Sequence, residues 1–517
     1  MTGTMQEYDV VIIGSGLGGL LCANILAEEG YKVCVLEKNQ QIGGNLQTFV
    51  RDRVIFDTGV HYLGGLAEGE NLNRFFKYFG IMDKLKLEKM DENGFDIVTF
   101  DGDINEYPYA QGYENFIRIL SQKFPDEEKS IRTYCDEIKR VCTRFPLYNL
   151  QNGESYHSDS ELLQTNAKAF IASITKNEKL KNVLAGTNLL YAGIGEKTPF
   201  YIHALVLNSY IESAWRCVGG GSQIAKLIEK NIRKFGGDIF KRSEVKQLKF
   251  EGEDLRYAEL ANGKTIQAKQ FISNAHPSVT LDLLEPGKIR KSYHTRFKSL
   301  ENSASAFTLY LVFKENTVNY INHNYYHFKN NDVWPPVDYK PGEWPLSYGT
   351  FMVAGLKPDK YAEGMAVLTY MKYDEVKQWE NTSSTVAHPD FRGEDYEEFK
   401  RQKSEILIDE LEKKFPGIRE NIKAYYSSTP LTYRDYIASP GGSMYGIVKD
   451  CYDPLKTLVP ARTKVKNLFF TGQNLHFHGV LGVTVSAFVT CSEILGLDYL
   501  LEKIAKKEKT ELVNKNM

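Results

Sequence analysis

A glycine-rich stretch near the start of the chain has the spacing of a loop that holds the phosphates of a dinucleotide. In it, Gly14 allows a tight turn, Gly16 lets a pyrophosphate approach the backbone, and Gly19 lets a helix lie close to a strand. Glu37 follows about twenty residues later, where a carboxylate can accept hydrogen bonds from the ribose hydroxyls. The expected chemistry is the binding of NAD or FAD by a loop made of Gly14, Ser15, Gly16, Leu17, Gly18 and Gly19.

The residues around this loop predict the elements that must position it. The apolar run Asp9 to Ile13 predicts a strand, and a helical pattern follows the loop and ends at Gly30. Lys32 to Leu36 predicts a second strand, which ends in the acid. In such a βαβ unit the helix N-terminus directs free N–H groups and a positive dipole end at the phosphates. The alternative is a structural βαβ unit that binds nothing, but the full context is far more specific than the glycines alone.

Two later segments can bring more backbone to the same ligand. The pair Gly43 and Gly44 lets the chain pass close to a flat or anionic group, because glycine has no Cβ. A buried strand is predicted over Asn467 to Phe470, and a helix is predicted to open at Gly482. The residues expected to contact the ligand there are Gly472, Gln473, Asn474, Gly482, Val483 and Thr484. Three or more contacts to one long cofactor favour FAD over NAD.

Two histidines lie between this strand and this helix. His476 and His478 are spaced to lie on one side of an extended segment. No cluster of Cys, Asp or Glu accompanies them, and a zinc site needs three or four ligands, so no metal is expected. They are the candidate catalytic residues, facing flavin or substrate; the alternative is simple packing of a loop.

Composition restricts the class of protein. The 517 residues include 64 basic and 66 acidic ones, which argues against a nucleic-acid partner, because such proteins carry a basic surface. The seven cysteines contain no CxxC pair, so buried thiols in a reduced, cytoplasmic setting are expected. The first seven residues lack the features of a signal peptide, and no apolar run reaches the length of a membrane span. Residues 498–509 fit a basic amphipathic helix on a membrane surface or, alternatively, a solvated terminal helix.

The predicted elements divide the chain into six regions. Residues 1–70 contain the βαβ unit and the glycine pair, 217–280 and 456–497 return to it, and 498–517 form a terminal tail. Residues 71–216 are mainly helical, with a hairpin over 95–108, and 281–455 form a substrate domain with a mixed sheet. A helix over Gln223 to Phe235 is expected to start from Ser222 as its N-cap. The expected fold class is α/β, with a Rossmann-like FAD-binding domain and an interleaved α+β substrate domain.

An acid, five residues and a glycine pair, followed by Phe56-Asp57-Thr58-Gly59-Val60-His61-Tyr62-Leu63-Gly64, resemble a known family. The resemblance is to the flavin-dependent phytoene desaturases, carotenoid isomerases and retinol saturases, which share their FAD fold with monoamine oxidases and Rab GDP-dissociation inhibitors. It implies FAD as cofactor. The resemblance also implies that Lys38, Asn45, His61, Val245 and Asn274 contact the cofactor.

Two departures from the family pattern are informative. Asn45 stands where amine oxidases and phytoene desaturases place an arginine, so a fixed positive contact to FAD cannot be assumed. Asn474 stands where an acid is usual, and it can hydrogen-bond a hydroxyl without charge. The continuation after the glycine pair is similar to the saturase and isomerase branch.

The resemblance implies an FAD-dependent oxidoreductase that saturates, desaturates or isomerises carbon–carbon double bonds of an apolar polyene. Asn45 and the Thr471-Gly472-Gln473-Asn474 segment favour saturation. The sequence contains no second glycine loop that could hold a resident nicotinamide cofactor. Electrons are therefore expected to pass to or from an external partner. The cofactor would carry the redox chemistry. Two alternatives remain open: a flavin amine oxidase, and a non-enzymatic lipid-binding module like the GDP-dissociation inhibitors. Peripheral contact with the cytoplasmic face of a membrane is also possible.

Overall fold

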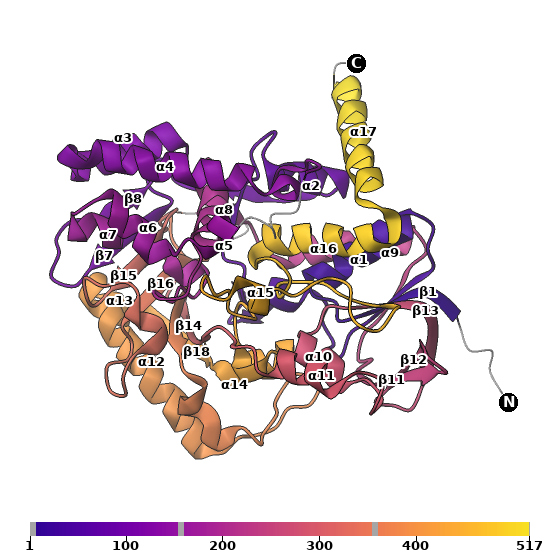
Figure 1. The fold of residues 1–517 in the computed structure, drawn as a ribbon. Helices are drawn as coiled ribbons and strands as arrows, with labels where there is room; N and C mark the ends of the chain where they lie inside the picture. The colour runs from indigo at the N-terminus through magenta and orange to yellow at the C-terminus, as the bar shows by residue number, and fades with distance from the viewer. Residues whose placement is uncertain (1–6, 154–159, 354–359, 516–517) are drawn as a thin grey trace.

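Two seven-stranded sheets organise the molecule. The computed structural model describes residues 7–153, 160–353 and 360–515, and Figure 1 shows its elements. The first sheet has the order β10-β2-β1-β13-β12-β11, with β19 also paired to β13. Its parallel strands are β1 (Glu7–Ile13), β2 (Val33–Leu36), β10 (Asp238–Phe240), β13 (Thr265–Ser273) and β19 (Leu468–Phe470).

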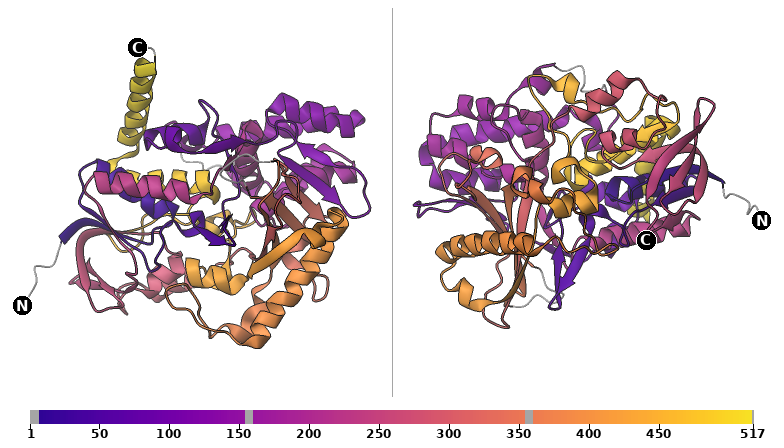
Figure 2. Two further views of the ribbon diagram at one scale, coloured as in Figure 1. Left: turned by 180° about the vertical axis from the view of Figure 1, so that it is seen from behind. Right: turned by 90° about the horizontal axis from the view of Figure 1, so that it is seen from below.

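The two faces of β1 pack into different cores. Val10 and Ile12 face α1 (Leu17–Glu28) and α16 (Gly479–Leu495), and α9 (Ser222–Lys234) packs beside α1 in the same layer, as Figure 2 also shows. Val11 and Ile13 face the other core, where α10 (Pro277–Asp282) and α11 (Lys291–Lys298) lie. A parallel sheet covered on both faces requires apolar residues at successive positions, which explains the continuous apolar run.

An antiparallel pair extends this sheet, as the sequence predicts. β11 (Val245–Glu251) pairs with β12 (Asp254–Leu260), which pairs with β13. The turn at Asn262-Gly263 between β12 and β13 has a glycine with φ of +80°. The chain returns to the parallel part of the sheet through this pair.

The second sheet has the order β18-β14-β17-β16-β15-β7-β8. One face packs on α12 (Glu394–Lys414), at the lower left of Figure 1, through Leu407, Ile408 and Leu411. The strands are β7 (Asp96–Phe100), β8 (Tyr107–Tyr109), β14 (Ser305–Phe313), β15 (Asn324–Phe328), β16 (Ser347–Met352), β17 (Gly364–Met371) and β18 (Ile422–Ser428). The predicted hairpin over residues 95–108 is therefore correct, and it joins a sheet whose other strands lie beyond residue 304.

Helices cover the remaining face of the second sheet and connect it to the first. They comprise α2 (Asn71–Tyr78), α3 (Tyr113–Lys123), α4 (Glu128–Thr143), α5 (Ser160–Gln164), α6 (Ala167–Ile174), α7 (Glu178–Leu184) and α8 (Phe200–Glu212). Small sheets pair β3 (Thr48–Arg51) with β4 (Val54–Asp57), and β5 (Leu63–Gly64) and β6 (Leu87–Lys89) with β9 (Ala214–Cys217). The predicted α/β class with an interleaved α+β part is confirmed.

Two predicted helix starts are wrong. The last core helix begins at Gly479 rather than Gly482. Gly482 lies in its first turn, where a Cβ would stand 2.5 Å from the carbonyl oxygen of Phe477. Gly221, not Ser222, is the N-cap of α9, and its N–H donates to Asp57 at 2.7 Å. The carboxylate from a distant strand thus holds the residue that precedes α9, and no side chain caps the helix.

The C-terminal helix α17 (Leu497–Lys515) projects from the body beyond α16 (Figure 1). Its apolar Leu500 and Ile504 are buried in the protein, and Lys507 pairs with Glu28 of α1. The apolar side of this amphipathic helix therefore packs on the protein itself. Among the described helices none is long and apolar enough alone to cross a bilayer; α16 and α17 pass that test only together and are bent by 118°.

Candidate functional site

The glycine loop, the glycine pair and the C-terminal loop meet around one cleft, which we call the central cleft. It has an empty volume of about 970 Å³. The end of β1, the start of α1, the exit of β13 and the loop between β19 and α16 all reach it. The predicted site residues that line it are Gly16, Leu17, Gly18, Gly43, Gly44, Asn45, Asn274, Gly472, Gln473, Asn474 and Val483.

The absence of Cβ atoms shapes this cleft. A Cβ at Gly16 would stand 2.5 Å from Nδ2 of Asn274, and one at Gly18 would stand 2.5 Å from its Oδ1. Gly472 has φ of +96° and approaches the same amide, while Gly16 and Gly43 form a backbone bridge. Three glycines thus surround one side-chain amide that reaches them from β13. The Asn274 amide fills the side of these glycines that it faces, while Gly16, Gly18 and Gly472 still line the central cleft. The contact of this loop with a pyrophosphate stays a prediction.

The N-terminal end of α1 is suited to an anion. Gly16 is its N-cap and makes no side-chain capping bond, and its first turn contains no acidic residue. The first N–H groups of a helix lack intrahelical partners and carry a partial positive charge. This end of α1 opens on the central cleft.

The Glu37 carboxylate is hydrogen-bonded to the glycine loop. One carboxylate oxygen accepts from the Ser15 N–H at 3.0 Å and from the Ser15 hydroxyl at 2.5 Å, and the other accepts from the Asn39 N–H at 2.7 Å. A carboxylate has about four acceptor positions, so further bonds to ribose hydroxyls fit. That ribose contact stays a prediction.

The other predicted contacts do not line the central cleft. Lys38 donates to the carbonyl of Asp435 at 2.6 Å, and burial lowers its pKa. His61 stacks on Phe351 at 4.3 Å between ring centroids. Gly14, Ser15, Gly19, Glu37, Val245, Gly482 and Thr484 also lie outside the lining. Gly19 acts by allowing α1 to pack on the Gly14 carbonyl, where a Cβ would clash.

A second pocket, which we call the inner pocket, adjoins the central cleft. It has an empty volume of about 660 Å³, and the two share Gly59, Val60, Tyr445, Gly479 and Val480. The rest of its lining includes Leu63, Leu72, Leu190, Leu205, Val206, Phe477 and Leu481, with Tyr62, Tyr210, Ser209 and His478 as polar members. No charged residue is among the described residues that line it. The inner pocket is therefore suited to an apolar ligand.

The structure separates the two candidate histidines. His478 lines the inner pocket, whereas His476 is buried and lines neither the inner pocket nor the central cleft. Nε2 of His478 lies 3.0 Å from the Leu190 carbonyl, and its ring lies 4.5 Å from that of Tyr445. Because a carbonyl only accepts, Nε2 must carry the proton, which leaves Nδ1 as an acceptor in the neutral ring. Burial lowers the pKa of His478 to about 4, so the ring is neutral at pH 7.

Sequence reasoning missed a buried hydroxyl and carboxyl pair behind the inner pocket. The Tyr62 hydroxyl lies 2.7 Å from Asp96 and 2.7 Å from the Tyr326 hydroxyl. Asp96 also accepts from Asn324, which in turn accepts from Arg216 at 2.9 Å. Burial raises the pKa of Asp96 to about 7. Tyr62 stands in the motif that carries the family resemblance, but Asp96 lies on a strand with no local signal.

We expect His478→Ala to reduce turnover by about tenfold or more while the protein keeps its flavin. The reason is that the substitution removes the Nδ1 acceptor and the contact with Tyr445, and positioned proton-transfer groups contribute at least this much. Steady-state turnover and flavin absorbance per polypeptide measure the two effects. The exposed His388→Ala is the matched control and should change neither. Unchanged kinetics of His478→Ala would assign this histidine to packing.

Known proteins resemble this chain over nearly its whole length. The family model described as flavin containing amine oxidoreductase matches residues 17–495. The all-trans-retinol 13,14-reductase of Homo sapiens is 27% identical over 538 residues, covering 95% of this chain and 86% of the relative. The prolycopene isomerase, chloroplastic, of Daucus carota is 26% identical over 520 residues, covering 97% and 82%. The crystal structure of an oxidoreductase from Methanosarcina mazei shares the fold, with a TM-score of 0.61 at 16% identity, covering 93% of this chain and 99% of that one.

Proposed function

The chain belongs to the family of flavin-containing amine oxidoreductases and is a flavoenzyme with FAD as its cofactor; we propose that it acts on carbon–carbon double bonds of an apolar polyene. The observation that carries the proposal is the inner pocket, which is lined by aliphatic and aromatic side chains and adjoins the central cleft. A polyene needs apolar walls and few polar groups. Two relatives are named for reactions on polyenes, retinol reduction and prolycopene isomerisation, which supports the same substrate class.

The central cleft fits FAD in its glycine-rich lining and in the N-terminus of α1, which has no side-chain cap. We infer that Gly16, Gly18 and Gly472 would hold the pyrophosphate, with Asn45 and Asn274 beside it. Bound there, FAD would supply the redox chemistry of the reaction. The remaining tasks belong to side chains of the chain itself.

The side chains of the inner pocket have three such tasks. Its leucines and valines bind the apolar chain and exclude water. The Tyr445 ring, held against His478, forms the wall that both compartments share and orients the substrate at the cofactor. His478 is the lining residue that we assign to proton transfer at the inner pocket, and the Tyr62 hydroxyl, which also lines it, donates a hydrogen bond to Asp96. Saturation is the favoured direction within this proposal.

The decisive experiment incubates the dithionite-reduced protein, without oxygen, with all-trans-retinol or with prolycopene and measures the product mass. A gain of two hydrogens would establish saturation, and a changed retention time at constant mass would establish isomerisation. Peroxide release from an amine panel instead would assign the chain to amine oxidation. A colourless protein that takes up no added FAD would contradict both enzyme assignments and favour a lipid-binding module.

A further inference from the structure

A third compartment, which we call the outer cavity, has no role in the reaction described above. It lies between the β3–β4 hairpin, β18, α12 and α14 (Pro430–Ile437), with an empty volume of about 1430 Å³. It shares Gly44, Asn45, Tyr433 and Ile437 with the central cleft. Among the described lining residues it shares none with the inner pocket. The outer cavity thus adjoins the central cleft through residues that the inner pocket does not share.

The walls of the outer cavity differ in chemistry from those of the inner pocket. Six aromatic side chains line it: Phe49, Tyr310, Tyr425, Tyr426, Tyr433 and Tyr436. Hydroxyl groups of several serines and threonines lie among these rings. Arg51, Lys400 and Arg401 contribute positive charge, and Glu397 contributes one negative charge. Flat aromatic faces bind planar rings, and cations bind anionic groups. An uncharged hydrocarbon uses neither the hydroxyls nor the cations.

Arg51 is the cation best placed to bind an anion. Its guanidinium lies 5.4 Å from the Phe49 ring and 5.5 Å from the Tyr426 ring, and it donates to the carbonyl of Val50. Within the described part of the chain no ion pair is formed by Arg51, whereas Lys400 pairs with Glu397 and Arg401 with Glu398. Arg51 can therefore bind a phosphate without first breaking an ion pair.

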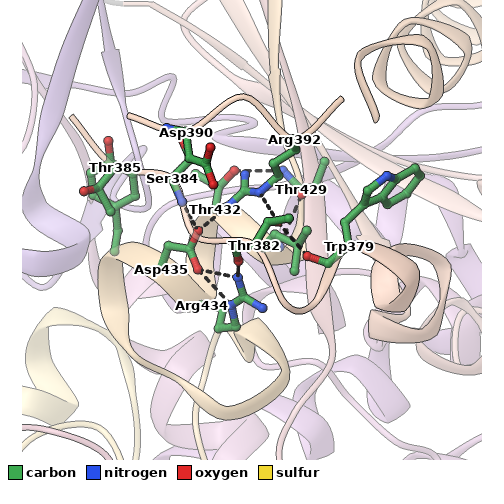
Figure 3. Close-up of polar contacts among 12 residues, drawn as sticks. Trp379, Thr382, Ser384, Thr385, Asp390, Arg392, Thr429, Thr432, Arg434 and Asp435 are labelled. Carbon is green, nitrogen blue, oxygen red and sulfur yellow. Dashed lines mark hydrogen bonds and ion pairs between the residues drawn. The ribbon is translucent and has the colours of Figure 1, made fainter. Parts of the chain in front are cut away.

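A segment that is held by hydrogen bonds and ion pairs, which we call the strap, contributes Val386 to the lining of the outer cavity. In Figure 3 the segment Thr382–Arg392 lies over Asp435 of α14, which accepts from the Ser384 N–H at 2.8 Å and pairs with Arg392 and Arg434. A further hydrogen bond joins the strap to α14: the Val386 N–H donates to the Tyr436 hydroxyl at 2.9 Å. Val386 and Tyr436 both line the cavity, so this wall is fixed before any ligand binds.

We propose that the outer cavity binds the electron carrier of the enzyme, a planar redox ring with an attached phosphate, as in reduced nicotinamide nucleotides or reduced FMN. The proposal rests on the proposed polyene chemistry. The carrier would give up two electrons and one proton as a hydride equivalent, FAD would be the acceptor, and the carrier would leave in its oxidised form. The rings of the cavity stack on the carrier ring, and Arg51 binds the phosphate at the rim.

The test measures binding of oxidised NADP⁺ and of FMN to the FAD-loaded protein by calorimetry, without any polyene. We expect one of the two to bind and Arg51→Gln to weaken it by about tenfold, as loss of a charge-assisted bond implies. Ser427→Trp, which places a bulky ring in the cavity, should abolish binding. Lys423→Gln is the matched control, because Lys423 lies on β18, is exposed and does not line the cavity. The affinity of this variant should equal that of the wild type.

Three results would overturn the proposal: binding of neither probe, equal weakening by Lys423→Gln and Arg51→Gln, or displacement of the bound probe when the polyene is added in a second titration. The last result would mean that the outer cavity holds the substrate. Tighter binding of NADP⁺ or of FMN identifies the carrier as a nicotinamide nucleotide or as a flavin nucleotide. Dithionite reduces the protein without the carrier. If the dithionite-reduced protein does not convert the polyene, the proposed function is contradicted, but the binding of the carrier is not.

Discussion

The Gly16→Val variant is expected to purify without flavin, with its affinity for FAD reduced by more than about a hundredfold. The new Cβ would stand 2.5 Å from the Asn274 amide, and the branched side chain would occupy the central cleft where the pyrophosphate must approach the backbone. Excluding the pyrophosphate removes several charge-assisted hydrogen bonds of about 1.5–3 kcal/mol each. The measurement is the flavin absorbance per polypeptide, followed by titration of the apoprotein with FAD.

A control separates cofactor loss from misfolding. Gly221→Ala also adds a Cβ to a glycine, but at φ of −67° and with its nearest neighbour at 3.4 Å, and Gly221 does not line the central cleft. It should keep its flavin. Circular dichroism of Gly16→Val should match the wild-type apoprotein, since the clash is with a side-chain amide that can move. A folded, yellow Gly16→Val protein would refute the assignment of the loop to the pyrophosphate.

The Asp435→Ala variant should lose about 3–5 kcal/mol of unfolding free energy, the usual result of removing one partner from a buried ion pair. Asp435 and Arg392 have side chains only 3% and 6% exposed, and Arg434 lies beside them (Figure 3). Without the carboxylate, two guanidinium groups share a buried position, and the strap loses its bond from Ser384. Guanidinium-induced unfolding with saturating FAD, which holds cofactor binding constant, measures the change.

The comparison for this variant is an exposed ion pair. Arg462 and Glu493 have side chains 54% and 32% exposed, so Arg462→Gln should change stability by about 1 kcal/mol or less. Asp435→Asn should fall between the two, because it keeps an acceptor and loses the charge. If Asp435→Ala unfolds at the wild-type denaturant concentration, the strap contributes nothing to the stability of the fold.

Local patterns were sufficient for the cofactor-binding half of the fold. A strand, a glycine turn, a helix and a strand within residues 7–36 depend on neighbours in the chain, so apolar periodicity predicts each of them. The hairpin turn at Asp101-Gly102 was predictable for the same reason, since Gly102 has φ of +72°. The N-cap at Gly221 was not, because its N–H bonds to Asp57 on a distant strand. The helix start at Gly479 was also missed, although the Phe477 carbonyl against which Gly482 packs lies close by in the chain.

By itself, the sequence determined the glycine loop, its βαβ frame and, through the motif from Phe56 to Gly64, the resemblance to flavin enzymes. Only the tertiary structure decided which side chains meet at the central cleft and the inner pocket: Asn274 among three glycines, His478 but not His476 at the inner pocket, and Tyr62 against Asp96. The physical reason is the distance along the chain over which each kind of interaction acts. Turn and helix preferences act over a few residues, whereas these contacts join segments whose approach is set by the packing of two sheets and their covering helices.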